Sequence, residues 1–370
     1  MFENTEIGFK SKSNKRLKKS KKLFKLLSIP FLVKAGKFLL LISNKLKLPT
    51  NKIIKNLFFD QFCGGETIEE CKDCINELNE YDIGSILDYS VEGNIKNIQT
   101  TKKEIINTIQ EAKNNENITF CVFKMSALIS FNSEERNLDC INEICQTAKD
   151  NSVPILIDAE ESWIQDEIDA ITERLMAKYN TKDKTIIFHT IQLYRKDKLN
   201  YLKKIHLEAK EKNYKIGLKL VRGAYMEKER NRAIKNGYES PIHKTKKECD
   251  IDFNLALEYC IKNIEEIEIF SGTHNENSCI ILTELMRENN LKNNDCRIHF
   301  SQLLGMSDHI SFNLSKKGFN VSKYVPFGPI KEMIPYLIRR AEENSSVKGQ
   351  TSRELSLIKK ELNRRKKQSI

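Results

Sequence analysis

After residue 80 the chain alternates between short apolar runs and longer charged stretches. The apolar runs are short enough to be β-strands, and the eight of them lie at 83–89, 118–124, 153–158, 185–192, 215–221, 267–274, 296–302 and 319–325. The stretches between them, such as 162–179, repeat an apolar residue every three or four positions, as an amphipathic helix does. Because each helix returns the chain to start a strand beside the last one, this alternation predicts a mostly parallel sheet.

Eight strand–helix units are the number that closes a (β/α)8 barrel, and about 270 residues is a usual size for one. The rival architecture is an open doubly wound sheet. When it holds a dinucleotide, that fold normally carries GxGxxG after its first strand, and the sequence has no such motif. We therefore predict an α/β protein with a TIM-like barrel over 81–350. A basic, partly amphipathic helical arm over 1–80 precedes the barrel, and a basic tail helix over 351–370 follows it.

The positive charge of the 370-residue chain is concentrated near its start. The formal net charge is +11, from 62 Lys and Arg against 51 Asp and Glu, yet residues 1–56 hold 15 of the basic residues and only two of the acidic ones. The remaining 47 basic and 49 acidic residues leave the barrel region almost neutral. A nucleic-acid-binding protein normally places Lys and Arg on the domain that reads the nucleic acid, so no nucleic-acid partner is expected.

Two interpretations of the arm stay open. Lysines and apolar residues interleave along it, which fits amphipathic helices resting on an anionic membrane surface. The alternative is a solvated helical extension packed on the barrel. The apolar residues concerned are Leu23, Phe24, Leu26, Leu27, Phe31, Leu32, Phe38 and Leu39.

Targeting signals are weak. The most apolar stretch near the start, 38–42, is far shorter than the ~20 residues of a spanning helix, and the polar first residues argue against a secretory signal. We expect a cytoplasmic protein, peripheral on the inner face of the membrane if the arm binds lipid.

The ten cysteines are then expected to be free thiols. Cys71 and Cys74 have the spacing of half a zinc site, but no second pair or nearby His completes it, so no metal is predicted.

Chemistry-bearing residues follow several of the predicted strands, where barrel enzymes place their sites. Lys124, Asp158 and Gln192 end the second, third and fourth strands, and the later strand ends carry Lys219, Arg222, Thr273, His274, Asn275 and Tyr324. Tyr336, Arg339, Arg340 and Glu343 share one face of the last predicted helix of the barrel. Paired guanidinium groups there suit a carboxylate or phosphate, although pairing with surface acids is the plainer explanation of two adjacent arginines.

Together these side chains indicate an amino acid substrate. Lys124, Arg339 and Arg340 could hold a carboxylate, Asp158 an amine, and Tyr225, Tyr324 and Tyr336 an apolar ring. No Ser or Cys stands beside a His in a recognisable nucleophile signature. If the reaction is an oxidation, a cofactor must carry the electrons, because side chains cannot.

Seven blocks of the sequence resemble the proline dehydrogenase family, in the order that the family has them. They are FKMSAL, LIDAEES, LVRGAY, GTHN, FSQLLGMSDHISF, YVPFGP and PYLIRRAEENSS, between about residues 120 and 350. The resemblance implies a distorted (β/α)8 barrel that binds FAD noncovalently without a Rossmann motif. It also implies oxidation of L-proline to Δ1-pyrroline-5-carboxylate, with the electrons passing to a membrane quinone.

The resemblance also implies roles for individual residues. Asp158 and Lys219 would act at the reacting centre, and Lys219 stands where many bacterial members have an arginine near the flavin N5. The substrate would contact Lys124, Tyr225, Leu303, Tyr324, Tyr336, Arg339 and Arg340. The cofactor would contact Ala159, Gln192, Lys219, Val221, Arg222, Gly223, Ala224, Thr273, His274, Asn275 and Glu343.

Other functions remain in competition. A Schiff-base aldolase would use Lys124 or Lys219 as its reactive amine, a hydroxyproline dehydrogenase would share the same site, and a membrane-surface scaffold would need none of the buried charges. The chain has no room for an aldehyde dehydrogenase half beside the barrel, so a separate pyrroline-5-carboxylate dehydrogenase is expected to take the product. The oligomeric state and the true electron acceptor are not readable from the sequence.

Overall fold

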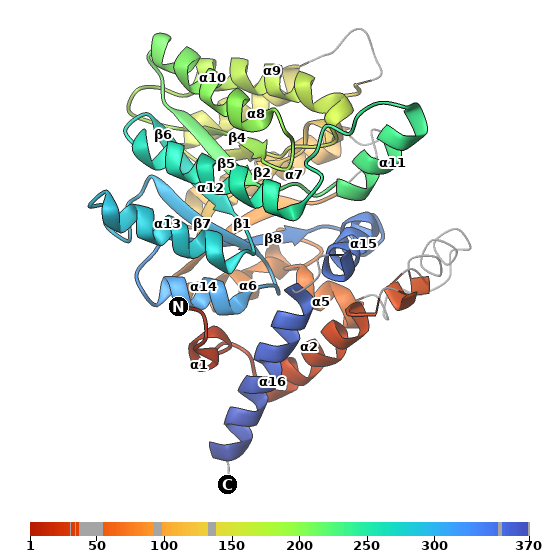
Figure 1. The fold of residues 1–370 in the computed structure, drawn as a ribbon. Coiled ribbons are helices and arrows are strands. Elements are labelled where there is room, and N and C mark those ends of the chain that lie inside the picture. The colour runs from red at the N-terminus through yellow and green to blue at the C-terminus, as the bar shows by residue number, and fades with distance from the viewer. Residues whose placement is uncertain are drawn as a thin grey trace.

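The computed structural model (Figure 1) describes residues 1–29, 31–33, 35–36, 55–91, 98–131, 138–346 and 350–368. Its eight strands are β1 (Ile83–Tyr89), β2 (Ile118–Phe123), β3 (Ile155–Ile157), β4 (Ile187–Gln192), β5 (Ile216–Val221), β6 (Ile267–Gly272), β7 (Ile298–Leu303) and β8 (Val321–Phe327). All neighbours pair in parallel, and β1 pairs with β8 to close the barrel. The predicted barrel is therefore confirmed, and each predicted apolar run overlaps one strand, with β7 and β8 ending one and two residues later than predicted.

Helices cover the outside of the barrel. Those before β6 are α6 (Ile68–Asn79), α7 (Ile98–Asn114), α8 (Asp139–Asn151), α9 (Ser162–Tyr179), α10 (Lys198–Glu211), α11 (Met226–Asn236) and α12 (Lys246–Lys262). After β6 come α13 (Glu276–Glu288), α14 (Asp308–Ser315) and α15 (Ile330–Ser346). The connection from β5 to β6 holds both α11 and α12, and Figure 1 shows α11 projecting from one edge of the barrel.

The interior of the barrel is filled by aromatic and aliphatic side chains. Phe120 from β2 lies edge-on to Phe188 from β4 and to Phe270 from β6, with ring centroids 5.3 and 5.1 Å apart. Ile86, Val122 and Leu156 complete this buried cluster. A filled interior leaves only the strand ends and their loops for chemistry, which is the usual arrangement in this architecture.

The two ends of the chain meet beneath the barrel. The N-terminal part contains α1 (Thr5–Gly8), α2 (Asn14–Leu27), the π-helical turn η1 (Lys55–Phe59) and α5 (Asp60–Phe62), and the C-terminal helix is α16 (Gln350–Gln368). Helices α2 and α16 lie side by side (Figure 1). Leu17, Leu23, Phe24 and Leu27 of α2 are buried there with Leu357 and Ile358 of α16. This face of α2 is thus packed on the protein, as the second interpretation of the arm expected.

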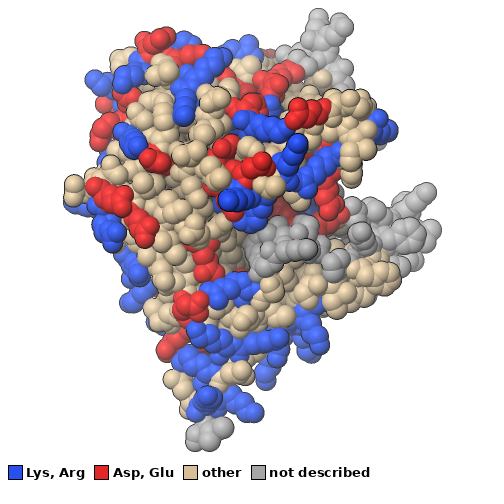
Figure 2. Space-filling model, in the orientation of Figure 1, with Lys and Arg blue, Asp and Glu red and all other residues tan. Residues whose placement is uncertain are grey.

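The other apolar residues of the arm behave differently. Leu26, Ile29, Phe31 and Leu32 are exposed, and Figure 2 shows Lys and Arg gathered over the part of the surface that α2 and α16 form. Phe38, Leu39 and the apolar stretch 38–42 lie outside the described residues. Among the residues described, no helix combines the length and the apolar character that crossing a membrane requires.

Candidate active site

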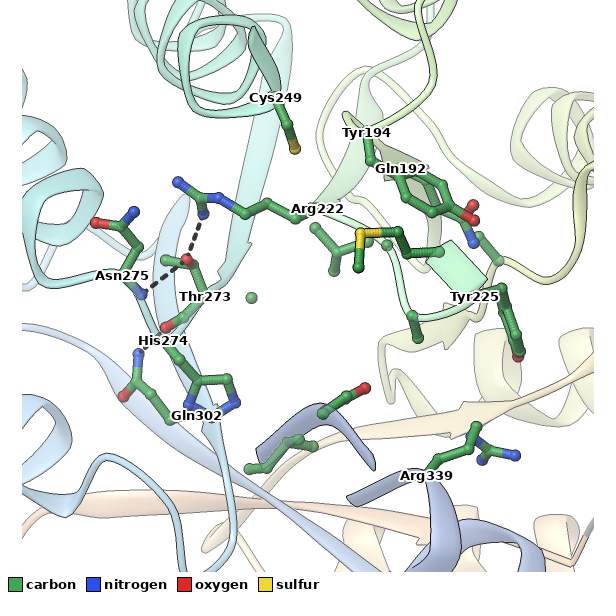
Figure 3. A pocket seen from close by; sticks show the side chains of 18 of the residues that line it. Gln192, Tyr194, Arg222, Tyr225, Cys249, Thr273, His274, Asn275, Gln302 and Arg339 are labelled. Atoms are coloured by element: carbon green, nitrogen blue, oxygen red, sulfur yellow. Dashed lines mark hydrogen bonds between the residues drawn. The ribbon is translucent and has the colours of Figure 1, made fainter. Parts of the chain in front are cut away.

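A cavity of ≈ 810 Å³ opens at the carboxyl ends of the strands. The structure brings every sequence-predicted site residue to its wall: Lys124, Asp158, Ala159, Gln192, Lys219, Val221, Arg222, Gly223, Ala224, Tyr225, Thr273, His274, Asn275, Leu303, Tyr324, Tyr336, Arg339, Arg340 and Glu343. Figure 3 shows part of this wall, with Arg339 entering from α15 on the side away from Arg222. The residues gather because parallel strands all end at the same rim of the barrel.

Asp158 is the centre of a buried charge network. Its carboxylate accepts hydrogen bonds from Lys219 Nζ at 2.6 Å, Lys124 Nζ at 3.1 Å and the Tyr324 hydroxyl at 2.9 Å. Burial raises the pKa of Asp158, but the Lys219 and Lys124 charges outweigh burial and hold the pKa well below its usual range. Asp158 therefore stays ionised at neutral pH and is a poor general base.

The predicted arginine pair lies on α15 beside this network. The buried Arg340 donates to Glu343 Oε1 at 2.6 Å, and its guanidinium lies 5.2 Å from the centroid of the Tyr336 ring. Both Arg340 Nε and the Tyr336 hydroxyl are buried without a hydrogen-bond partner among the described residues. Unsatisfied buried polar atoms are costly, so atoms of this kind on a cavity wall indicate groups that a ligand completes.

Arg222 is held rigidly on the opposite side of the cavity. It donates to Asp250 Oδ1 at 2.7 Å, Thr273 Oγ1 at 2.7 Å and Ser278 Oγ at 2.9 Å. Asp250 and Ser278 were missed by sequence reasoning, because they come from α12 and α13 and follow no strand. These three acceptors hold the Arg222 guanidinium in one orientation. Its positive charge therefore faces the cavity in a fixed position (Figure 3).

Gly223 brings the backbone close to the same region. Its φ of +132° is rarely adopted by other residues, and a Cβ added there would lie 2.5 Å from the Tyr194 ring. Tyr194 is a cavity residue that the sequence did not single out. Glycine at 223 thus lets the backbone of the LVRGAY turn pass over an aromatic ring with no side chain between backbone and ring.

His274 stands at the base of the cavity as a neutral imidazole. Burial, and then the positive charges of Lys323 and Arg340, lower its pKa to about 3. Its Nδ1 lies 3.0 Å from Ser307 Oγ, a partner within the FSQLLGMSDHISF block that sequence reasoning did not name. A neutral ring can donate one hydrogen bond and accept another, which suits a polar ligand without adding charge.

The cavity is large and its wall carries several buried polar atoms that a ligand could bind. Besides the groups on α15, Gln192 Oε1 and Thr190 Oγ1 are buried there without partners among the described residues. Its volume lies within the range of about 300–1,000 Å³ that is usual for ligand and cofactor pockets. Within the described residues, no group of three or more His, Cys, Asp or Glu side chains is placed to hold a metal ion, and the ten cysteines are free.

Comparisons with known proteins show which family the chain resembles. The family model described as proline dehydrogenase matches residues 71–353. "Proline dehydrogenase 1, mitochondrial" of Dictyostelium discoideum is 33% identical, over 98% of this chain and 74% of its own length. "Carbapenem antibiotics biosynthesis protein CarD" of Pectobacterium carotovorum subsp. carotovorum is 32% identical over 85% of both chains.

Solved structures agree in fold. Proline utilization A (PutA) from Bdellovibrio bacteriovorus, inactivated by N-propargylglycine, superposes with a TM-score of 0.73 at 18% identity. The match covers 92% of this chain and 38% of the PutA chain, so the likeness concerns one part of a longer protein and supports the fold alone. With the match to the family model over residues 71–353, the relatives above 30% identity decide the assignment: the chain belongs to the proline dehydrogenase family.

Proposed function

We propose that the chain oxidises L-proline to Δ1-pyrroline-5-carboxylate, the first step of proline catabolism, with FAD bound in the cavity as the electron acceptor. The observation that carries this proposal is the Asp158 network, which lies in one cavity with the Arg339–Arg340 pair. Proline needs both halves of that arrangement: cations for its carboxylate and a hydrogen-bond acceptor for its ring N–H.

The substrate carboxylate is held by Arg339, Arg340 and Lys124. Guanidinium groups bind carboxylates with two parallel hydrogen bonds, which fixes orientation as well as position. Arg340 is already constrained by Glu343 and by the face of Tyr336, so little freedom is lost when it binds. A fixed carboxylate places the ring carbons reproducibly, and orientation of this kind supplies a large part of enzymatic rate enhancement.

The substrate ring packs against Tyr324, Tyr336, Tyr225 and Leu303, and its nitrogen faces Asp158. A ring nitrogen must be unprotonated before hydride can leave the neighbouring carbon. Asp158 is a poor acceptor for that proton, because the Lys219 and Lys124 charges depress its pKa and the carboxylate binds a proton only weakly. We therefore assign Asp158 and Lys219 to orienting the substrate and to maintaining the charge of the site, and the free amine binds from solution.

Residues on the remaining wall fit FAD. When bound, FAD supplies the two-electron acceptor that no side chain can provide. Arg222 and the 223–224 backbone can meet its phosphates, and Gln192, Thr273, His274 and Asn275 can meet its polar edges, with Ala159, Val221 and Glu343 alongside. The Gln192 Oε1 and Thr190 Oγ1 atoms support this fit, because neither has a hydrogen-bond partner in the part of the chain that the structure describes. Lys219 keeps a positive charge beside the reacting centre, which favours a reduced, anionic acceptor.

A quinone is the proposed next electron acceptor, reached at the membrane surface through the arm. Support comes from the exposed apolar side chains of Leu26, Ile29, Phe31 and Leu32 beside the lysines of α2. We place the protein on the inner face of the membrane, with a separate pyrroline-5-carboxylate dehydrogenase downstream. The Schiff-base aldolase is not favoured, because the side-chain nitrogens of both candidate lysines are already engaged by Asp158 in ion pairs.

The visible spectrum of the purified protein tests the proposal directly. Flavin bands that bleach on anaerobic addition of L-proline would establish cofactor and substrate together. Bands that respond only to trans-4-hydroxy-L-proline would move the assignment to hydroxyproline. A colourless protein that takes up no added FAD, and whose lysine is trapped by borohydride in the presence of a carbonyl substrate, would replace the flavoenzyme with the aldolase.

A further inference from the structure

Glu160 is a buried carboxylate beside the cavity that the proposed chemistry does not use. It follows Asp158 by two residues at the end of β3, and only 4% of it is exposed. Its Oε1 accepts a hydrogen bond from the Ser126 backbone N–H at 2.9 Å, and its Oε2 accepts one from the Ser126 hydroxyl. Burying a carboxyl group is costly unless it is hydrogen-bonded, so these two contacts account for its presence here.

Ser126 belongs to the turn that directly follows Lys124. This turn, η3 (Met125–Ala127), begins where the ladder between β2 and β3 ends at the pair Phe123 and Ile157. The hydrogen bonds from Ser126 to Glu160 continue the connection between the two strand ends past that point. A lysine side chain is flexible, so where its ammonium group can lie depends on how firmly its backbone is held.

Glu160 is itself braced from two other elements. Its backbone N–H donates to Gln165 Oε1 of α9 at 2.6 Å, and its carbonyl accepts from Gln192 Nε2 of β4 at 3.0 Å. Gln165 in turn donates to Asp169 at 2.7 Å, and both glutamines are buried. Glu160, whose carboxylate binds the turn after β2, is therefore also held through its backbone by α9 and β4.

We propose that Glu160 is a positioning residue for substrate binding: by clamping the turn at Ser126, it holds the Lys124 ammonium where that group meets Asp158 and the substrate carboxylate. This inference rests on the proposed role of Lys124. Geometry supports it, because Lys124 Nζ lies 3.1 Å from Asp158, in the segment after β3 that also carries Glu160. Burial raises the pKa of Glu160 to about 7, so the clamp needs hydrogen bonds more than it needs a full negative charge.

Two variants distinguish the effect of the hydrogen bonds between Glu160 and Ser126 from the effect of the negative charge on Glu160. In Glu160→Gln the amide oxygen can still accept the Ser126 N–H, and the amide NH₂ can donate to the Ser126 hydroxyl oxygen. Glu160→Leu fills similar space and makes neither bond. We expect E160L to raise the proline KM about tenfold with kcat changed less than about threefold, since tenfold corresponds to one hydrogen bond, and we expect E160Q to stay within about twofold of wild type. If E160Q lost as much as E160L, or if E160L kept the wild-type KM, the clamp would be wrong.

A double-mutant cycle tests whether Glu160 acts through Lys124. The KM of K124M should not rise further when E160L is added, because the clamped group is already gone. Glu229 is the matched control: it is fully buried and accepts the same pair of bonds from Ser162, at 2.7 Å from the backbone N–H and 2.6 Å from the hydroxyl. The effects of E229L and K124M should multiply. Multiplying effects for E160L and K124M would overturn the proposal.

A crystal structure of E160L gives a readout independent of turnover. The proposal expects the 125–127 turn to shift and the contact between Lys124 and Asp158 to lengthen, whatever the substrate is. An unmoved turn with the 3.1 Å contact intact would refute the clamp. A wild-type protein that ignores proline while E160L shows the shifted turn would instead refute the proposed function and leave the positioning role of Glu160 standing.

Discussion

At the scale of single residues, the site concentrates more positive than negative charge. Lys124, Lys219, Arg339 and Arg340 face the cavity together with the anions Asp158 and Glu343. A carboxylate entering this cavity replaces water around groups that already carry an excess of positive charge, so binding it costs less than burying an isolated ion.

Replacing Arg340 with Met should raise the proline KM roughly 10- to 100-fold, because the substrate carboxylate loses one charge-assisted hydrogen bond. The flavin bands of the purified variant should remain, because Arg340 faces the substrate. Arg297 is a matched control: it precedes β7 at the far end of the barrel and pairs with Asp295 and Glu265. R297M should leave KM unchanged. An R340M enzyme with wild-type KM would contradict the carboxylate assignment.

The pH dependence of kcat/KM should report the substrate amine. The pKa of Asp158 is depressed, so this carboxylate stays ionised above about pH 4, the ordinary value for aspartate. Activity should therefore rise with pH across the neutral range as more proline is unprotonated, with no separate limb from Asp158. Steady-state rates between pH 6 and pH 9, measured also for Glu160→Gln, test this expectation. A limb near pH 7 that disappears in E160Q would assign the titration to the enzyme.

The sequence located much of the site because its residues directly follow strands. Lys124, Asp158 and Gln192 could be predicted from the barrel pattern alone, since all strand ends meet at one rim. Glu160, Asp250 and Ser307 could not be assigned roles, because they act by holding Lys124's turn, Arg222 or His274. Contacts of that kind depend on turn geometry and on which helix packs beside which loop, and these leave no periodic signal in the chain.

At the scale of elements, α2 has one apolar face and one basic face. The apolar face packs against α5, α15 and α16, whereas Leu26 near the end of the helix is exposed. The sequence predicted amphipathic helices in the arm but could not show which of their apolar residues are buried, because it does not show where α16 packs.

Substitutions at Phe24 and Leu26 compare a buried position of α2 with an exposed one. Phe24 is 1% exposed and meets Phe62 edge-on at 6.4 Å, whereas Leu26 is 43% exposed. Phe24→Ala should lower the free energy of unfolding by about 3–5 kcal/mol, the usual cost of emptying a core site. Leu26→Ala should change it by less than about 0.5 kcal/mol. Urea unfolding measures both. Equal effects would show that α2 is not packed on the protein in solution.

At the scale of the whole molecule, one buried charge cluster connects the N-terminal segment to the barrel. Asp308 of α14 binds Lys12 at 2.7 Å and Lys323 of β8 at 2.8 Å. Lys323 is fully buried and also donates to the Met306 carbonyl at 2.6 Å, within the loop between β7 and α14 that carries Ser307. The first residues of the chain therefore help to hold an active-site loop.

Asp308→Asn should destabilise the protein by about 3–5 kcal/mol at pH 7, because it leaves Lys323 buried without its counter-ion. Despite burial, Lys12 and Lys323 depress the pKa of Asp308, so its stabilisation is present above the ordinary aspartate value and is lost as pH falls below it. The gap between wild type and D308N should shrink on acidification, as denaturant titrations at several pH values would show. Asp60→Asn, at an exposed pair with Lys19, should cost less than about 1 kcal/mol. A constant gap would mean that Asp308 is not ionised in the native protein.

The pairing of α2 with α16 has a consequence for biosynthesis. A ribosome completes α2 long before α16, and the ~320 residues between them take roughly 15–65 s to make at about 5–20 residues per second. During that interval Leu17, Leu23, Phe24 and Leu27 have no α16 to cover them. The nascent chain thus exposes a basic helix whose apolar face is not covered by α16. Chaperones bind exposed apolar segments of this kind. Packing of α2 against α16 is therefore a late event, because it cannot begin before α16 has been made.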